Sequence, residues 1–335
     1  METILEVENL KTKFKTENGI IAVVDGVDFH VKAGETLGIV GESGCGKSVT
    51  SLSIMRLLPG NSQNDGTIRF KGKDLLSLSD KEMQKVRGNE IGMIFQEPMT
   101  SLNPLHTIGK QIEEPIKKHT KSSKHELKER AIQLLKAVGM PRAEEIYREY
   151  PHNLSGGMRQ RVMIAIAMAC NPKLIIADEP TTALDVTIQA QILELMRDVK
   201  ERTGTSIMLI THDLGVVSEM CDRVIVMYAG QVVEEMMVEE LFEHSKHPYT
   251  MGLIESIPDI EEEKEYLYTI AGSVPLPNQM PEGCRFAPRC PDAMSICEQQ
   301  QPDLVAVGKK HKCRCWIYQD VKEDSNEQLQ ASSRN

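Results

Sequence analysis

A glycine-rich segment between Gly41 and Ser48 combines the residue types that hold phosphate groups. It has the sequence Gly-Glu-Ser-Gly-Cys-Gly-Lys-Ser. Because glycines carry no side chain, the backbone amides of such a segment can approach phosphate oxygens, and Lys47 adds a positive charge beside the terminal phosphates. The Ser48 hydroxyl suits a magnesium ion bound to the same phosphates. The nucleotide-binding residues predicted here are Gly41, Ser43, Gly44, Gly46, Lys47, Ser48 and Val49.

Two carboxylates follow an apolar stretch much farther along the chain. Asp178 and Glu179 come directly after Leu174-Ile-Ile-Ala, a run typical of a buried strand. The end of such a strand lies at the carboxyl edge of the sheet, beside the phosphate segment, where Asp178 can bind magnesium. Glu179 is then the candidate base that polarises the attacking water. Taken alone, the two residues could equally be a surface acidic pair, so it is the motifs that precede them that favour hydrolysis.

The sequence Leu154-Ser-Gly-Gly lies between the phosphate segment and the acidic pair. Its Ser155, Gly156 and Gly157 have no phosphate left to bind in their own subunit, because the glycine-rich segment already encloses it. The order of these three motifs resembles that of the ATP-binding subunits of ABC transporters. The resemblance implies that two such domains stack head to tail, each offering these three residues to the γ-phosphate held by the other. ATP would join the pair, and hydrolysis would release it.

The same resemblance assigns further residues within the first 250 positions. Gln96 corresponds to a glutamine that contacts magnesium and the attacking water. His212 corresponds to a histidine that contacts the γ-phosphate, although a lone histidine after a strand is more often structural. Asp185 corresponds to an element that acts across the dimer, and Phe14 is the candidate for stacking on adenine, with a place in the core as the alternative. The implied catalytic residues are Glu179, His212 and Gln96, and the implied magnesium ligands are Ser48, Gln96 and Asp178.

Apolar runs must supply the strands and helices that position these residues. Leu37–Val40 predicts a buried strand that enters the glycine-rich segment, and Ser48–Leu58 predicts the helix that follows. Helical spacing predicts a helix over 127–138, capped by Ser122 or Ser123, inside a helical insertion over about 88–160. The other predicted elements are strands at Ile4–Val7, Ile20–Val24, Val27–Val31, Leu174–Ala177 and Ile207–Ile210, and a helix at Ile188–Glu201.

The expected fold class is α/β, with three parts along the chain. Residues 1–250 form a P-loop NTPase core of the ABC ATPase type, which has an antiparallel β subdomain and the helical insertion. After Gly230 the composition changes, and residues 251–319 form a separate C-terminal extension that contains cysteines. Residues 320–335 are polar with a single leucine, and they predict a disordered tail.

Five cysteines crowd into 32 residues of the extension, namely Cys284, Cys290, Cys297, Cys313 and Cys315. In a reducing compartment such a group favours a metal or iron–sulfur site over disulfides. The spacing matches neither the close pairs of zinc ribbons nor the ferredoxin pattern. The family resemblance favours a [4Fe–4S] cluster, with zinc as the alternative and plain reduced thiols as the third possibility. The implied ligands are Cys284, Cys290, Cys297 and Cys315, the last preferred to Cys313 because Trp316 follows it.

The extension also narrows the kind of ABC protein. His247-Pro-Tyr-Thr and the run Gly283-Cys-Arg-Phe-Ala-Pro-Arg-Cys-Pro resemble the C-terminal extension of oligopeptide and dipeptide importer ATPases. Nickel importers share part of it, so import of nickel chelates is an alternative, and a soluble ABC ATPase without a transport role is another. The resemblance implies two permease subunits and a second ATPase subunit, different or identical, as partners. An extracellular solute-binding protein would take part indirectly.

Composition sets the expected location. The 335 residues carry a net charge of −10, which argues against nucleic acid as a partner. The longest apolar run, Val162–Cys170, is far shorter than the roughly 18 residues of a spanning helix, and the start of the chain lacks the features of a signal peptide. We therefore expect a peripheral protein at the cytoplasmic face of the cell membrane, held there by other subunits.

Overall fold

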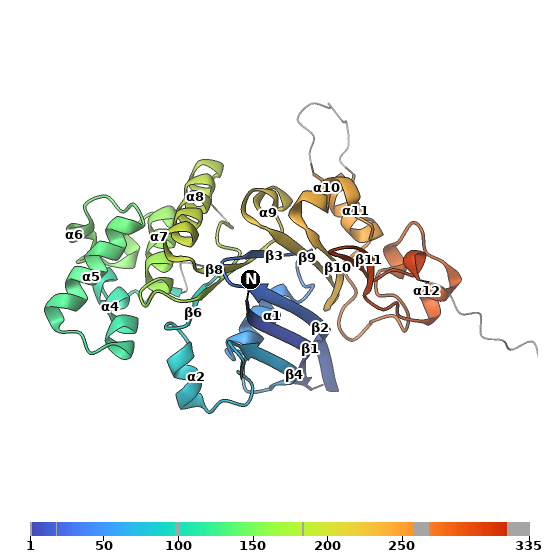
Figure 1. Cartoon of the computed structure of the whole chain (residues 1–335), viewed down its shortest axis with the longest axis horizontal. Helices are drawn as coiled ribbons and strands as arrows, with labels where there is room; N and C mark the ends of the chain where they lie inside the picture. The colour runs from blue at the N-terminus through green and yellow to red at the C-terminus, as the bar shows by residue number, and fades with distance from the viewer. Residues whose placement is uncertain (1, 18, 98–100, 183, 258–267, 320–335) are drawn as a thin grey trace, which may run out of the picture.

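A mixed sheet of eight strands runs through the centre of the molecule (Figure 1). The computed structural model describes residues 2–17, 19–97, 101–182, 184–257 and 268–319. In order across the sheet the strands are β11 (Val305–Gly308), β12 (His311–Cys313), β10 (Gln231–Met237), β9 (Arg223–Tyr228), β3 (Thr36–Val40), β8 (Ser206–Thr211), β7 (Leu174–Asp178) and β6 (Ile91–Ile94). The last five run parallel, so their carboxyl ends meet at one edge, as expected for an α/β core.

A second sheet of four antiparallel strands packs below the first in the view of Figure 1. Its strands, in order, are β2 (Gly19–Lys32), β1 (Thr3–Thr16), β4 (Ser62–Phe70) and β5 (Lys73–Asp74). The prediction of two strands at Ile20–Val24 and Val27–Val31 was wrong, because β2 is continuous. The register with β1 is irregular at this point, and the Asp25 amide donates to the carbonyl of Gly230, in the turn between β9 and β10, at 2.9 Å.

Helices flank the main sheet, and some of them project beyond it at one end of the molecule. They are α1 (Lys47–Ile54), α2 (Asp80–Val86), α4 (Ile108–His119), α5 (Lys124–Ala137), α6 (Ala143–Ile146), α7 (Gly156–Ala167), α8 (Val186–Thr203), α9 (Leu214–Met220), α10 (Leu241–His244), α11 (Pro248–Glu255) and α12 (Ser295–Gln299). Helix α1 ends before the predicted Leu58. Arg56 has a left-handed backbone with φ of 49° and donates to the Leu75 and Leu78 carbonyls, which stops the helix. None of the described helices has the length and apolar content needed to cross a bilayer.

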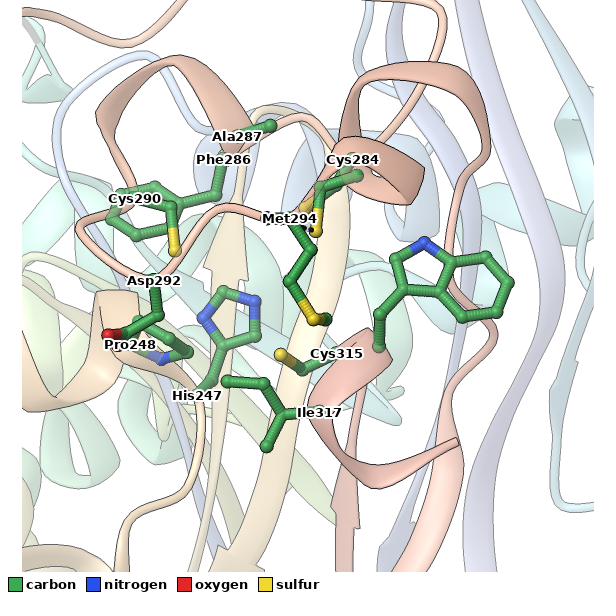
Figure 2. Close-up of a pocket in the computed structure, with 12 residues that line it drawn as sticks. His247, Pro248, Cys284, Phe286, Ala287, Cys290, Asp292, Met294, Cys315 and Ile317 are labelled. Carbon is green, nitrogen blue, oxygen red and sulfur yellow. Dashed lines mark hydrogen bonds between the residues drawn. The ribbon is translucent and has the colours of Figure 1, made fainter. Parts of the chain in front are cut away.

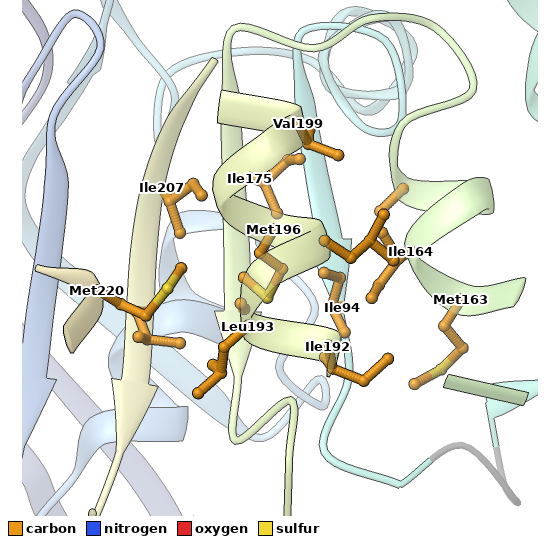
Figure 3. Close-up of a cluster of buried hydrophobic side chains, with 14 of the residues drawn as sticks. Ile94, Met163, Ile164, Ile175, Ile192, Leu193, Met196, Val199, Ile207 and Met220 are labelled. Carbon is orange, nitrogen blue, oxygen red and sulfur yellow. The ribbon is translucent and has the colours of Figure 1, made fainter. Parts of the chain in front are cut away.

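Helices α4 to α7 form an arm at one end of the molecule. The predicted cap at Ser123 is confirmed, since its hydroxyl accepts from the Glu126 amide and the Glu126 carboxylate accepts from the Ser123 amide. The predicted helical segment 88–160 is not helical at its start, because β6 adds to the edge of the main sheet. Figure 3 shows the apolar side chains that fasten β6 and helices α7 and α8 together, among them Ile94, Ile164 and Met196. This packing fixes where α7 and α8 begin.

The C-terminal extension continues the main sheet. The expectation of a separate region after Gly230 was wrong, since β10 pairs with β9 and β12 pairs with β10, with Glu234 opposite Cys313. Phe286 of the extension packs on Tyr228 and Tyr249, with ring centroids 5.2 and 5.4 Å apart. The extension therefore shares the core of the ATPase. The predicted tail, residues 320–335, lies outside the described residues.

Candidate active site

The glycine-rich segment links β3 to α1, as the sequence predicts. Two of its glycines are required by shape: a Cβ at Gly41 would lie 2.2 Å from the Met227 carbonyl oxygen, and Gly46 has φ of +100° at the start of α1. Lys47 folds back over the segment, and its Nζ donates to the carbonyls of Gly41 at 2.6 Å and Glu42 at 3.1 Å. The segment thus holds the buried Lys47 ammonium group against two of its own backbone carbonyls.

A cavity of about 180 Å³ opens above this segment. It is lined by Val23, Ser43, Gly44, Gly46, Lys47, Ser48, Val49, Gln96 and Glu179. All of these except Val23 are predicted site residues. Val23 comes from the antiparallel sheet and belongs to no motif, so no sequence signal pointed to it. Phe14 does not line the cavity; it is half-buried on β1, opposite Ile21 and Ser62.

Asp178 ends β7 and is oriented by two hydroxyls of α1. Ser48 Oγ donates to Asp178 Oδ1 at 2.9 Å, and Ser51 Oγ donates to Asp178 Oδ2 at 3.2 Å. The aspartate is only 4% exposed, and this burial raises the pKa of its carboxyl, although the two hydroxyls act in the opposite direction. Ser51 had not been predicted; its position one helical turn after Ser48 is the signal that could have identified it. The Ser48 hydroxyl and the Asp178 carboxylate are oxygen donors suited to magnesium.

Glu179 accepts hydrogen bonds from a residue that follows the neighbouring strand β6 and from a residue three positions farther along its own loop. Its carboxylate accepts from Gln96 Nε2 at 3.0 Å and from Thr182 Oγ1 at 2.9 Å, and His212 Nδ1 lies 3.5 Å away. The glutamate side chain is 14% exposed and the histidine 61% exposed. The structure thus brings together the three predicted catalytic residues, which come after β6, β7 and β8. Thr182 is a fourth member that no motif indicated.

The Ser155 motif and Asp185 do not line this cavity. Ser155 Oγ caps α7 by accepting from the Met158 amide at 3.4 Å, and Asp185 caps α8 by accepting from the Ile188 amide at 3.0 Å. The two helix starts touch, because a Cβ on Gly157 would lie 2.7 Å from Ile188 Cγ2. Ser155, Gly156 and Asp185 are exposed. Within one chain they therefore form a second surface, at the starts of α7 and α8, apart from the cavity.

Four of the clustered cysteines line a small cavity of about 10 Å³ in the extension (Figure 2). They are Cys284, Cys290, Cys297 and Cys315. Cys313 does not line the cavity; it is buried on β12. Burial raises the pKa of Cys290 to about 11 and also raises the pKa values of Cys284 and Cys315, which favours neutral thiols. Among the described residues, no three or more His, Cys, Asp or Glu side chains are arranged as metal ligands, so the predicted iron–sulfur cluster is not supported.

Comparison with known proteins identifies relatives whose functions agree with this site. Residues 24–182 match the family model described as ABC transporter, and residues 233–297 match the one described as Oligopeptide/dipeptide transporter, C-terminal region. The chain is 59% identical to the oligopeptide transport ATP-binding protein AppD of Bacillus subtilis (strain 168) over 322 residues, which are 96% of this chain and 98% of AppD. It is 55% identical to OppD of the same organism over 317 residues, which are 94% of this chain and 88% of OppD.

Solved structures place the fold in the same group. The chain superposes with a TM-score of 0.63 on a dimeric structure of a post-hydrolysis state of the ATP-binding cassette MJ0796 bound to ADP and Pi; the two are 31% identical, with 70% of this chain and 99% of MJ0796 covered. For cbiO1 from Clostridium perfringens, part of the ABC transporter complex cbiONQ, the TM-score is 0.62 at 29% identity, with 73% and 92% covered. The chain therefore belongs to the ABC transporter family, as an ATP-hydrolysing subunit that carries the C-terminal region of oligopeptide/dipeptide transporters.

Proposed function

We propose that this chain hydrolyses ATP to drive an importer of oligopeptides or dipeptides across the cell membrane. The observation that carries the proposal is one cavity lined by Lys47, Ser48 and Glu179, with Asp178 hydrogen-bonded to Ser48, in a chain that also has the peptide-transporter C-terminal region. The names of AppD and OppD describe oligopeptide transport. Import of nickel chelates and a soluble role without transport are therefore not favoured.

The site residues divide the work of hydrolysis. The glycine-rich segment and Lys47 bind the phosphates, while Ser48, Asp178 and Gln96 would hold magnesium, which would supply charge neutralisation at the phosphates. Glu179 is the base that orients the attacking water and takes its proton. His212 contacts the γ-phosphate from the end of β8. Phe14 or Val23, both on the antiparallel sheet, contacts the adenine.

A second ATPase subunit completes the site. Ser155, Gly156, Gly157 and Asp185 are positioned by two helix starts but do not reach the cavity of their own chain. In a head-to-tail pair, each chain presents them to the γ-phosphate of the other. MJ0796, which has the same fold, was solved as a dimer bound to ADP and Pi. The pair works at the cytoplasmic face of the membrane, bound to two permease subunits and supplied by an extracellular solute-binding protein.

The chain divides functionally near residue 250, although its two parts share the main sheet. Residues 1–250 form the ATPase, with the arm within about 88–160, and residues 251–319 form the extension. The four cavity cysteines supply the sulfur donors that a [4Fe–4S] cluster or, as the alternative, zinc would need, although the described side chains are not arranged as ligands to either. Analysis of iron and acid-labile sulfide in anaerobically purified protein tests this. The Cys284→Ser variant should lose the iron, and protein with neither iron nor zinc would reject both metals.

Peptide uptake in cells tests the transport function. Cells whose only copy carries Glu179→Gln should fail to take up labelled dipeptides and oligopeptides, and the native chain should restore uptake. The peptide length restored identifies the substrate class. Normal uptake with the variant, in a strain without a related ATPase, would reject the proposal, and uptake of nickel chelates would be measured next.

A further inference from the structure

The C-terminal extension contacts the phosphate-binding segment directly, through an arginine–glutamate ion pair. Arg289 donates from Nη1 to Glu42 Oε2 at 2.6 Å and from Nη2 to Glu42 Oε1 at 3.0 Å. Glu42 is the second residue of the glycine-rich segment, and Arg289 lies beside Cys290 in the extension. The Arg289 side chain is 5% exposed, so the pair is shielded from solvent on the arginine side. A bidentate pair of this kind fixes the orientation of the two side chains as well as the distance between them.

Arg289 is itself held in place by the extension and the main sheet. Its Nε donates to the Ala271 carbonyl at 2.9 Å, and its Nη2 donates to the Ile270 carbonyl at 3.2 Å. The guanidinium also lies over the Tyr228 ring, 5.8 Å from the centroid. The arginine therefore reaches Glu42 from a fixed position, which is what a positioning side chain requires.

The backbone of Glu42 is held as firmly as its carboxylate. Its amide donates to Tyr249 Oη at 2.8 Å, and Tyr249 is a buried residue of α11. Its carbonyl accepts from Lys47 Nζ at 3.1 Å. Glu42 thus connects the extension to the lysine of the phosphate site. A shift of Glu42 would move a contact on which Lys47 depends.

The negative charge of Glu42 would oppose ATP binding if Arg289 did not neutralise it. A carboxylate within the phosphate-binding segment would repel the polyphosphate of ATP unless a cation neutralises it. We propose that Arg289 is a positioning residue for ATP binding, which neutralises Glu42 and fixes the phosphate segment from the extension. This inference rests on the proposed nucleotide site and adds a role for the extension at that site.

ATP affinity of the full-length chain tests the inference. Arg289→Ala should raise the Kd for magnesium-ATP roughly five- to tenfold, because Glu42 is left charged and unpaired. Arg289→Lys should raise the Kd less than Arg289→Ala does, since lysine keeps the positive charge but cannot make the bidentate hydrogen bond. Adding Glu42→Gln to Arg289→Ala should bring the Kd back toward the native value, because the repelling charge is gone. The Kd values come from calorimetric titration, and melting temperatures are measured alongside.

The control is Lys312→Met. Lys312 Nζ pairs with Glu235 at 3.0 Å and also joins the extension to the core, but neither residue contacts the phosphate segment. This variant should keep the native Kd whatever its melting temperature. Two results would overturn the inference: a native Kd in Arg289→Ala, or a double variant that binds ATP as weakly as Arg289→Ala alone. A native chain that binds no ATP would instead reject the nucleotide site, and this inference with it.

Discussion

Glu179 has a backbone conformation that a residue with a side chain rarely adopts. Its φ is +47°, in the left-handed region, and its amide donates to the Ile210 carbonyl at 2.9 Å. Such a conformation costs on the order of 1 kcal/mol and persists where the surroundings enforce it. Here it turns the chain directly after β7, which places the proposed magnesium ligand Asp178 and the proposed base Glu179 at adjacent positions.

Replacement of Glu179 by Gln removes the base and keeps the shape. We expect hydrolysis to fall at least about a hundredfold, because positioned bases contribute on that scale, while ATP binding is retained. Steady-state ATPase assays and ATP titration measure the two effects. The control is Glu201→Gln, an exposed glutamate near the end of α8, which should leave both unchanged. Turnover at the native rate in Glu179→Gln would remove this residue as the base.

Asp178 allows a test of the magnesium assignment. In the native chain, removal of magnesium with EDTA should weaken ATP binding several-fold, because the ion neutralises phosphate charge. Asp178→Asn keeps the shape that fits between Ser48 and Ser51 but loses the carboxylate. Its ATP affinity should be nearly the same with and without magnesium, as measured by titration in both buffers. A native response to magnesium in Asp178→Asn would show that the carboxylate is not a ligand.

At the scale of elements, two helix caps with the same geometry separate stability from function. Ser155 caps α7 and Ser123 caps α5, each with its hydroxyl 3.4 Å from the amide three residues on. Either serine replaced by alanine should lower the free energy of unfolding by about 1 kcal/mol. Ser155→Ala alone should also lower ATPase activity in the assembled pair, by roughly tenfold or more, because its hydroxyl serves the partner's γ-phosphate.

Denaturant unfolding, ATP titration of the isolated chain and ATPase assays of the assembled complex measure these effects. The affinity of the isolated chain for ATP should stay native in both variants, since neither serine lines the cavity. Equal losses of activity in Ser123→Ala and Ser155→Ala would mean that α7 contributes only through stability. Loss of ATP binding by isolated Ser155→Ala chains would contradict a site shared between two chains.

Elements with local signals could be predicted from the sequence, and those that depend on distant partners could not. The strand, glycine segment and helix around Lys47 follow from neighbouring residues, as does the capped start of α5. Strand β6 has four residues and exists because β7 pairs with it, and β12 joins the sheet through β10 from far along the chain. Likewise, Val23 reaches the cavity by packing from the antiparallel sheet, so no motif marks it. Ser51 and Thr182 lie close in sequence to Ser48 and Glu179, but the motifs did not include them.

At the scale of the whole molecule, the main sheet joins the ATP site to the extension. Its parallel strands end at Asp178 and near His212, while its antiparallel strands β10 and β12 carry the extension. Aromatic packing and the Arg289–Glu42 pair cross the same boundary. The sequence indicated two regions of different composition, but it could not show that they share a core, because that contact involves residues far apart in the chain.

The loop after β6 carries an exposed leucine. Leu105 is 82% exposed, and the chain beside it is held by the buried Gln111 of α4, which bonds to the backbone of Asn103 and His106. We expect Gln96 and the loop over 99–105 to receive a permease helix; residues 99 and 100 lie outside the described residues. An exposed apolar side chain nine positions after Gln96, which itself donates to Glu179, fits a docking contact linked to the active site.

Replacement of Leu105 by Asp should break this contact and spare the rest of the chain. Burying a leucine contributes about 1.5–3 kcal/mol, so the affinity for the permease subunits should fall at least roughly tenfold. Co-purification from detergent-solubilised membranes measures assembly, and titration with ATP should give a native Kd. The control is Leu276→Asp, since Leu276 is also exposed but lies in the extension. ATP binding needs only one chain. Loss of ATP binding together with loss of assembly in Leu105→Asp would therefore point to misfolding. Native assembly of this variant would place the permease contact elsewhere on the arm.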